Sequence, residues 1–203
     1  GLGDVYKRQT AYSALKKANL KKGQNSVVII SAGGLGLLSL KIIQAAYSIN
    51  PIVVDIDDEK LELAKKAGAS AVINSNDEKI YEKIAELTDG GATSVIDFVG
   101  ASETFELASG MFGMKRGGTY VIVGLIGGQT KLQLPMTTLT ARTIRGVYVG
   151  SLQEMEELMQ LVRENKIDHI EVEKRNASEA NNTLNDLKNG KINGLVCLTH
   201  DHE

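Results

Sequence analysis

The chain has 203 residues and a mass of 21.8 kDa, the size of one large domain or of one domain with part of a second. Hydrophobic residues make up 42% of it and charged residues 24%, a balance that excludes the disordered, collagen-like and coiled-coil classes. The net charge of -2 gives no electrostatic basis for binding nucleic acid or an anionic membrane, and no run of apolar residues is long enough to span a membrane. A single cysteine, Cys197, excludes an internal disulfide and a cysteine-cluster zinc site within this chain.

The two ends of the chain differ from its body. Residues 1–9, GLGDVYKRQ, lack an initiator Met and an apolar signal-peptide core, and they resemble a translated sequencing-adapter remnant; a natural frayed N-terminus is the alternative. We therefore treat residues 1–9 as a non-native leader and expect a cytoplasmic protein. Residues 200–203, HDHE, superficially offer metal ligands, but a chain end with few anchoring contacts usually frays, which favours a plain tail.

From residue 10 onward, short β-branched runs alternate with helical patterns. A short helix is predicted over 10–20. Strands are predicted at 26–30, 52–55, 71–73, 94–98 and 119–123, with helices at 34–48, 58–67, 80–87 and 102–112 between them. Strands without polar alternation are typical of parallel sheets buried on both faces. The order predicts an α/β fold with a doubly wound parallel sheet, a Rossmann domain.

After Gly124 the pattern changes to strict alternation. Thr130, Leu132 and Leu134 alternate with Lys131 and Gln133 until Pro135 ends the run, which predicts a half-exposed strand at the edge of the sheet.

The remainder of the chain predicts two helices and a strand. Ser151 and Glu154 form a capping-box pattern that opens a helix, a second helix is predicted over 178–188, and residues 195–198 predict a terminal strand. We accordingly divide the chain into a dinucleotide-binding domain at 10–165 and C-terminal elements at 166–203.

The first predicted strand leads directly into a glycine-rich turn, SAGGLG, and then a helix. This is the G-x-G-x-x-G dinucleotide fingerprint with Ser31 in place of its first glycine. Gly33 would let the backbone approach a pyrophosphate and Gly36 would let helix and strand pack closely, while the helix N-terminus, including Gly34, would receive the phosphates. A serine can make the turn if its φ stays negative. A glycine turn without a ligand is the alternative.

An acidic residue follows the second strand at the spacing that the fingerprint expects. Asp55 lies 19 residues after Gly36, and its carboxylate can accept both hydroxyls of the adenosine ribose. It would repel a 2′-phosphate, so NAD is favoured over NADP. Lys60, one helical turn further on, could reach the same ribose. The alternatives are a helix N-cap or loop carboxylate for Asp55 and a solvated lysine for Lys60.

Two later strands also end on glycine. Ligands of this architecture lie over the carboxyl ends of the strands, which would place Gly100 near the adenosine half and Gly124 with Leu125 near the nicotinamide. Ordinary loop glycines are the competing interpretation. Arg145 is a candidate cation on the cofactor side, with a loop arginine as the alternative.

Residues that could perform acid–base catalysis are scarce. The sequence has no G-x-S-x-G elbow, no H-E-x-x-H and no Walker A lysine. His169 is interpreted as a surface or edge residue and Cys197 as a small buried hydrophobe. These residues do not assemble an acid, a base and an electrophile.

With these motifs together, residues 10–199 resemble the cofactor-binding half of the zinc-dependent alcohol dehydrogenases of the medium-chain dehydrogenase/reductase superfamily. The ordered series of matching segments is far more specific than any one motif. The segments are Thr10-Ala-Tyr-Ser-Ala-Leu-Lys16, Ser31-Ala-Gly-Gly-Leu-Gly36, Val54-Asp-Ile-Asp-Asp-Glu-Lys60-Leu61, Ala67-Gly-Ala69, Asp97-Phe-Val-Gly100, Gly117-Gly-Thr-Tyr-Val-Ile-Val-Gly124-Leu125 and Thr143-Ile-Arg-Gly-Val-Tyr-Val-Gly150-Ser151.

The resemblance implies reversible hydride transfer between an alcohol and NAD, with a zinc ion that polarises the alcohol or carbonyl oxygen. It places Thr10 near the nicotinamide and the backbone around Gly124 at the carboxamide. It also implies a homo-dimer or homo-tetramer formed through the edge strand at 130–135.

Departures from the family pattern concern the zinc and the pyrophosphate. The family's last catalytic zinc ligand, a cysteine, corresponds to Tyr6 here, and the other ligands and the proton relay belong to an N-terminal catalytic domain that this chain does not contain. Where the family has Gly-Arg, with the arginine on the pyrophosphate, this chain has Gly194-Leu195, which should weaken cofactor binding.

The sequence therefore predicts the NAD-binding part of a zinc-type alcohol dehydrogenase that is inactive as this fragment. The alternatives are a zinc-independent reductase of the quinone oxidoreductase type, against which Asp55 argues because those enzymes usually favour NADPH, and a non-catalytic NAD-binding sensor or structural domain.

Overall fold

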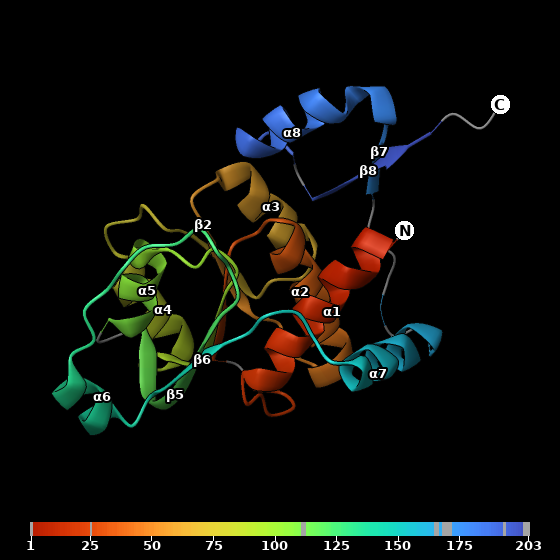
Figure 1. Cartoon of the computed structure of the whole chain (residues 1–203). Coiled ribbons are helices and arrows are strands. Elements are labelled where there is room, and N and C mark those ends of the chain that lie inside the picture. Colours follow the sequence, from red (N-terminus) through yellow and green to blue (C-terminus); the bar gives the residue numbers. More distant parts are fainter. Residues whose placement is uncertain are drawn as a thin grey trace.

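The computed structural model describes residues 2–24, 26–110, 113–164, 167, 172–192 and 194–200, with side chains described from residue 6 onward. Helices and strands alternate along the chain (Figure 1). In order they are α1 (Leu2–Lys17), β1 (Val27–Ile30), α2 (Gly34–Tyr47), β2 (Ile52–Asp55), α3 (Asp58–Lys66), β3 (Ala71–Asn74), α4 (Ile80–Thr88), β4 (Ala92–Asp97), α5 (Ser102–Ser109), β5 (Met114–Ile122), α6 (Leu134–Thr140), β6 (Thr143–Gly146), α7 (Leu152–Arg163), β7 (Val172–Asn176), the 3-10 turn η1 (Ala177–Glu179), α8 (Ala180–Lys188) and β8 (Leu195–Thr199).

The main sheet has six strands in the order β3-β2-β1-β4-β5-β6, and every neighbouring pair is parallel. The strand order reverses between β1 and β4, where Ile30 pairs with Asp97 on one side and Val54 on the other. This arrangement confirms the doubly wound parallel sheet, and it places the crevice of such a sheet at the carboxyl ends of β1 and β4.

The strands of the sheet centre are buried on both faces. Val28 and Ile29 are successive residues of β1 that are at most 2% exposed, yet they belong to separate cores on opposite faces of the sheet. The first core contains side chains of α1, α2, α3 and α7, and the second contains side chains of α4 and α5 (Figure 1). The uninterrupted apolar runs of the sequence follow from this double burial.

The predicted edge strand at 130–134 is wrong. Residues 128–133 have no regular structure, and α6 begins at Leu134 with Pro135 in its first turn. Proline is well suited to that position because it has a fixed φ and needs no amide donor there. The edge of the sheet is instead β6, which pairs with β5 and is exposed along its length.

Some other element boundaries differ from those predicted from the sequence. Helix α1 begins at Leu2 and ends at Lys17, whereas the sequence predicted a helix over 10–20. The predicted helix at 102–112 ends at Ser109, and residues 111 and 112 lie outside the description. The capping box of Ser151 and Glu154 is confirmed, with the Glu154 amide donating to Ser151 Oγ over 3.2 Å.

A separate two-stranded sheet follows α7. Strand β7, which the sequence did not predict, pairs in parallel with β8, and α8 connects the two (Figure 1). His169 and residues 201–203 lie outside the described residues, so their predicted roles stay predictions. None of the helices in the described part of the chain is long and apolar enough to cross a membrane.

Candidate functional site

The glycine-rich turn connects β1 to α2 at the reversal of the sheet. Ser31 adopts a φ of +97°, so the negative φ under which a serine could make this turn is not observed. Its amide donates to the Val54 carbonyl of β2 over 2.8 Å, and its hydroxyl accepts from the Gly33 amide over 3.1 Å. The chain therefore turns sharply while still bonded to the neighbouring strand, a conformation that glycine adopts more easily than serine.

Gly36 allows the helix to begin directly against this turn. A Cβ atom at Gly36 would lie 1.8 Å from the carbonyl oxygen of Ser31, far inside van der Waals contact. A Cβ at Gly34 would lie 2.9 Å from Leu195 Cδ2 and 3.1 Å from the Gly194 oxygen. The start of β8 therefore lies against the N-terminus of α2.

The N-terminus of α2 is suited to an anion. Gly33 is its N-cap residue, no side chain caps the helix, and its first turn contains no acidic residue. The unbonded amides of a helix N-terminus and the helix dipole together favour negative charge.

Asp55 connects the end of β2 to the glycine turn. Its Oδ2 accepts from the Ala32 amide over 2.6 Å and its Oδ1 from the Asp57 amide over 3.1 Å. A carboxylate offers about four lone-pair sites, so two remain for further donors. The N-cap of α3 is Asp57, which accepts from the Glu59 and Lys60 amides, and the N-cap interpretation of Asp55 is wrong.

Lys60 lies on the first turn of α3. Its Nζ is 3.4 Å from Asp57 Oδ2, and its side chain is only 18% exposed. A Cβ at Gly190 would lie 3.7 Å from the same Nζ, so the ammonium group reaches the end of α8. Lys60 is thus half-buried between α3 and the end of α8, and it is not a fully solvated lysine.

Gly100 and Gly124 contact each other at the carboxyl edge of the sheet. A Cβ at Gly100, whose φ is +67°, would lie 2.0 Å from the Gly124 oxygen, and a Cβ at Gly124 would lie 2.1 Å from the Val99 carbonyl carbon. These glycines are therefore required by a close approach of two loops. Leu125 follows with 80% of its surface exposed.

Asp97 is a buried acidic residue that sequence reasoning used only as part of a motif. It is 0% exposed at the end of β4, and its Oδ2 accepts from the hydroxyls of Tyr120 and Thr104, each over 2.6 Å. Burial, and secondarily the Asp97 carboxylate, raises the pKa of the Tyr120 hydroxyl well above its ordinary value. An aspartate is rarely buried without hydrogen-bond partners, so its occurrence in an otherwise apolar strand was the feature of the sequence that could have indicated its role.

The remaining predicted site residues are placed separately from the turn. Thr10 is buried in α1 and donates from Oγ1 to the Tyr6 oxygen over 3.1 Å. Arg145 is exposed in the middle of β6. Cys197 on β8 is half-buried, so its interpretation as a buried residue is wrong.

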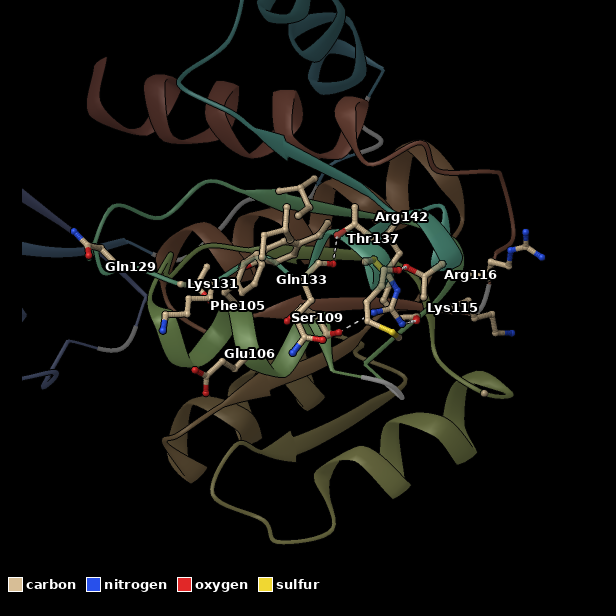
Figure 2. Close-up of a pocket in the computed structure, with 18 residues that line it drawn as sticks. Phe105, Glu106, Ser109, Lys115, Arg116, Gln129, Lys131, Gln133, Thr137 and Arg142 are labelled. Carbon is tan, nitrogen blue, oxygen red and sulfur yellow. Dashed lines mark hydrogen bonds between the residues drawn. The ribbon is translucent and has the colours of Figure 1, made fainter.

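A groove of about 730 Å³ lies elsewhere, between α5, β5 and residues 129–144 (Figure 2). Arg142 points into it and donates from Nη1 to the Ser109 oxygen over 2.7 Å, whereas Lys115, Arg116 and Lys131 lie toward its ends. Burial lowers the pKa of the Arg142 guanidinium. The groove does not include the glycine turn or Asp55.

Comparison with known proteins gives consistent results. A family model described as zinc-binding dehydrogenase matches residues 34–164. An NAD-dependent alcohol dehydrogenase of Sulfurisphaera tokodaii is 33% identical over 93% of this chain and 54% of its own length, and an alcohol dehydrogenase of Geobacillus stearothermophilus is 34% identical over 93% and 54%. The crystal structure of the alcohol dehydrogenase of Aeropyrum pernix superposes with a TM-score of 0.83 at 29% identity, covering 95% of this chain and 55% of that one.

The parallel sheet, the glycine turn at its reversal and the acid on the neighbouring strand together define a Rossmann-type fold with the features of a dinucleotide site. The chain belongs to the zinc-binding dehydrogenase family, whose members are oxidoreductases. It spans about half the length of the curated relatives it matches.

Proposed function

We propose that this chain binds NAD(H) as the cofactor domain of an alcohol dehydrogenase. The observation that carries the proposal is the bond from the Ala32 amide to Asp55 Oδ2, 2.6 Å long, which fixes a carboxylate beside the glycine turn. A dinucleotide needs both features close together, because the pyrophosphate and the adenosine ribose are adjacent in it.

Each part of the cofactor has a corresponding part of the chain. The amides at the start of α2, from Gly34 to Gly36, hold the pyrophosphate, and the free lone pairs of Asp55 accept the ribose hydroxyls. Lys60 supports the same ribose. The carboxylate charge repels a 2′-phosphate, which selects NAD over NADP. When bound, NAD would supply the acceptor for a hydride from the carbon of the alcohol.

The nicotinamide half would lie over the carboxyl ends of β4, β5 and β6. Gly124 and Leu125 would line its path at the carboxyl edge, with Arg145 on the outer strand and Thr10 in α1 as further contacts. Gly100, which the sequence placed near the adenosine half, contacts Gly124 and would lie on the nicotinamide side instead. These assignments rest on the position of the strand ends in a doubly wound sheet.

Zinc does not fit the described residues. Within the ranges that the structure covers, no group of three His, Cys, Asp or Glu side chains could hold a metal ion. We propose that the zinc ligands and the proton relay are supplied by a part of the whole protein outside these 203 residues, and that the chain alone binds cofactor without turnover. The whole protein would act on a small alcohol or carbonyl compound and form a homo-dimer or homo-tetramer.

Titration of the purified chain with NADH and, separately, NADPH tests the proposal, with nicotinamide fluorescence as the readout. Saturable NADH binding and poorer NADPH binding are expected. Asp55→Ala should weaken NADH binding at least about tenfold, because a charged acceptor of ribose hydroxyls is worth about 1.5–3 kcal/mol. Asp55→Asn keeps an acceptor for the Ala32 amide while removing the charge, so it should narrow the preference for NADH over NADPH.

Asp58→Asn is the matched control. Asp58 lies in the first turn of α3 and accepts from Asn74 Nδ2 over 2.7 Å, so its replacement makes the same charge change nearby. The NADH affinity of the Asp58→Asn variant should equal that of the unchanged chain. An Asp55→Ala variant that binds NADH as well as the unchanged chain would refute the assigned role.

A further inference from the structure

Asp97 organises the backbone beyond the end of its own strand. Its Oδ1 accepts from the amides of Val99 and Gly100 over 2.8 and 3.0 Å, while Oδ2 holds the two hydroxyls described above. Its main-chain oxygen accepts from the amides of Val123 and Gly124 over 2.8 and 3.2 Å. One fully buried residue therefore fixes the loop after β4 with its side chain and the loop after β5 with its backbone.

These two loops, residues 99–101 and 123–127, are called the paired loops below. The Ile126 amide donates to the Val99 oxygen over 3.2 Å and the Gly127 amide to the Gly100 oxygen over 3.0 Å. A parallel bridge joins Ala101 to Gly127. The paired loops extend the pairing of β4 and β5 past the edge of the sheet, so a shift of one loop displaces the other.

The paired loops lie on one side of the crevice only. Asp55, on β2, marks the adenosine side of the reversal point, and β4 and β5 lie on the opposite side of β1. Leu125 and Ile126 project from the paired loops with 80% and 74% of their surfaces exposed. A dinucleotide across the crevice would present its nicotinamide half to them and its adenosine diphosphate to the glycine turn.

We propose that Asp97 is a positioning residue for the nicotinamide half of the cofactor. Its carboxylate sets the place of the paired loops, and through them the surface that the nicotinamide ring contacts, without touching the cofactor itself. This inference rests on the proposed function, because it assumes that the crevice binds NAD(H).

A purely structural role for Asp97 predicts a different pattern of losses. Removal of a buried acceptor that serves four donors destabilises the fold in either case, because the amides and hydroxyls lose their partner. General loosening would weaken every ligand of the crevice alike. If Asp97 is a positioning residue, its removal weakens the binding of NADH more than the binding of ADP, because ADP contains only the half of the cofactor that the glycine turn and Asp55 bind.

The test measures binding of NADH and of ADP by calorimetry to the full chain and to variants at Asp97. In Asp97→Ala we expect the NADH dissociation constant to rise at least about tenfold and that of ADP less than about threefold. Asp97→Asn should recover NADH binding to within about threefold, since the amide oxygen still accepts from Val99 and Gly100. Equal losses for both ligands in Asp97→Ala, or unchanged NADH binding, would overturn the positioning role.

Tyr120→Phe serves as the matched control. It removes a donor to Asp97 Oδ2 and leaves the acceptor of the loop amides in place, so the dissociation constants of NADH and ADP should change by similar small factors. If Asp97→Ala does not fold, Asp97→Val removes the same acceptor of the loop amides while filling more of the space that the carboxylate occupies. The same selective loss of NADH is expected there, and parallel losses would again refute the inference.

The unchanged chain separates the two proposals. If it binds neither ADP nor NADH, the proposed function fails, and the positioning role with it. If it binds both and the variants lose them in parallel, only the positioning role fails.

Discussion

Ser31 is a site where one substitution pair measures backbone strain directly. A non-glycine residue at a φ of +97° lies well outside the left-handed helical region near +57°, and such conformations cost about 1–3 kcal/mol. Glycine relieves this strain but loses about 0.4–1 kcal/mol through the greater freedom of the unfolded chain. Alanine keeps the strain and removes the hydroxyl that accepts from the Gly33 amide.

We expect Ser31→Gly to be more stable than Ser31→Ala by about 1–2 kcal/mol, the strain less the entropy of glycine. For a chain of this length that corresponds to a melting temperature higher by about 2–8 °C. Urea unfolding followed by circular dichroism gives the free energies, and calorimetry gives the melting temperatures.

Ser70 provides the control pair. It is an exposed loop residue that is not among the described residues with positive φ. There the glycine variant should be the less stable of the two, because no strain offsets the entropy. If the glycine and alanine variants at Ser31 unfold at the same denaturant concentration, the assignment of strain to this turn is wrong.

Two further changes have clear expected results. Leu195→Arg should tighten NADH binding about tenfold, because Leu195 contacts Gly34 at the start of α2 and a guanidinium there can pair with a pyrophosphate. Leu195→Gln, which adds no charge, should leave the NADH affinity unchanged. If the arginine and glutamine variants bind NADH equally well, the placement of the pyrophosphate at the start of α2 is wrong. Glu157→Gln tests the contact of α1 with α7. Hydrogen bonds from Lys16 and, secondarily, from Tyr12 lower the pKa of Glu157 from its ordinary value of 4.5. The contribution of Glu157 to the free energy of unfolding is therefore complete above pH 4.5 and is lost as the pH falls through the lowered pKa. The free energy of unfolding of Glu157→Gln should be lower than that of the unchanged chain by at most about 1 kcal/mol at pH 7, with the difference disappearing in acid, and a difference independent of pH would refute this.

The sheet could be predicted from the sequence wherever burial imposes a pattern. Ile52–Asp55 has the bounds that were predicted, because a strand buried on both faces needs an unbroken apolar run. Thr143–Gly146 is exposed on all four residues and lacks such a run, so it was missed as a strand. The alternation at 130–134 predicted a strand that the structure lacks, and Pro135 was taken as the end of a strand although it also favours the first turn of a helix.

The site was predictable only in part for a related reason. Spacing alone placed Asp55 beside the glycine turn, because the motif is local and its geometry follows from the fold. The contact of Gly100 with Gly124 and the hydrogen bond from Tyr120 to Asp97 join segments more than twenty residues apart in the chain, and no local pattern reports such contacts. The positive φ of Ser31 could not be predicted from its residue type either, because residues other than glycine prefer a negative φ.

The turn between β1 and α2 also indicates how this motif can change over evolution. Position 31 favours glycine without strictly requiring it, because an unsuitable dihedral angle there costs a limited free energy that the rest of the fold can offset. Position 36 has a steric requirement, because its neighbour at 1.8 Å is a main-chain oxygen that every residue type at position 31 would carry. Sequence drift in this fingerprint should therefore accumulate at position 31, where a serine already stands, and leave position 36 as glycine.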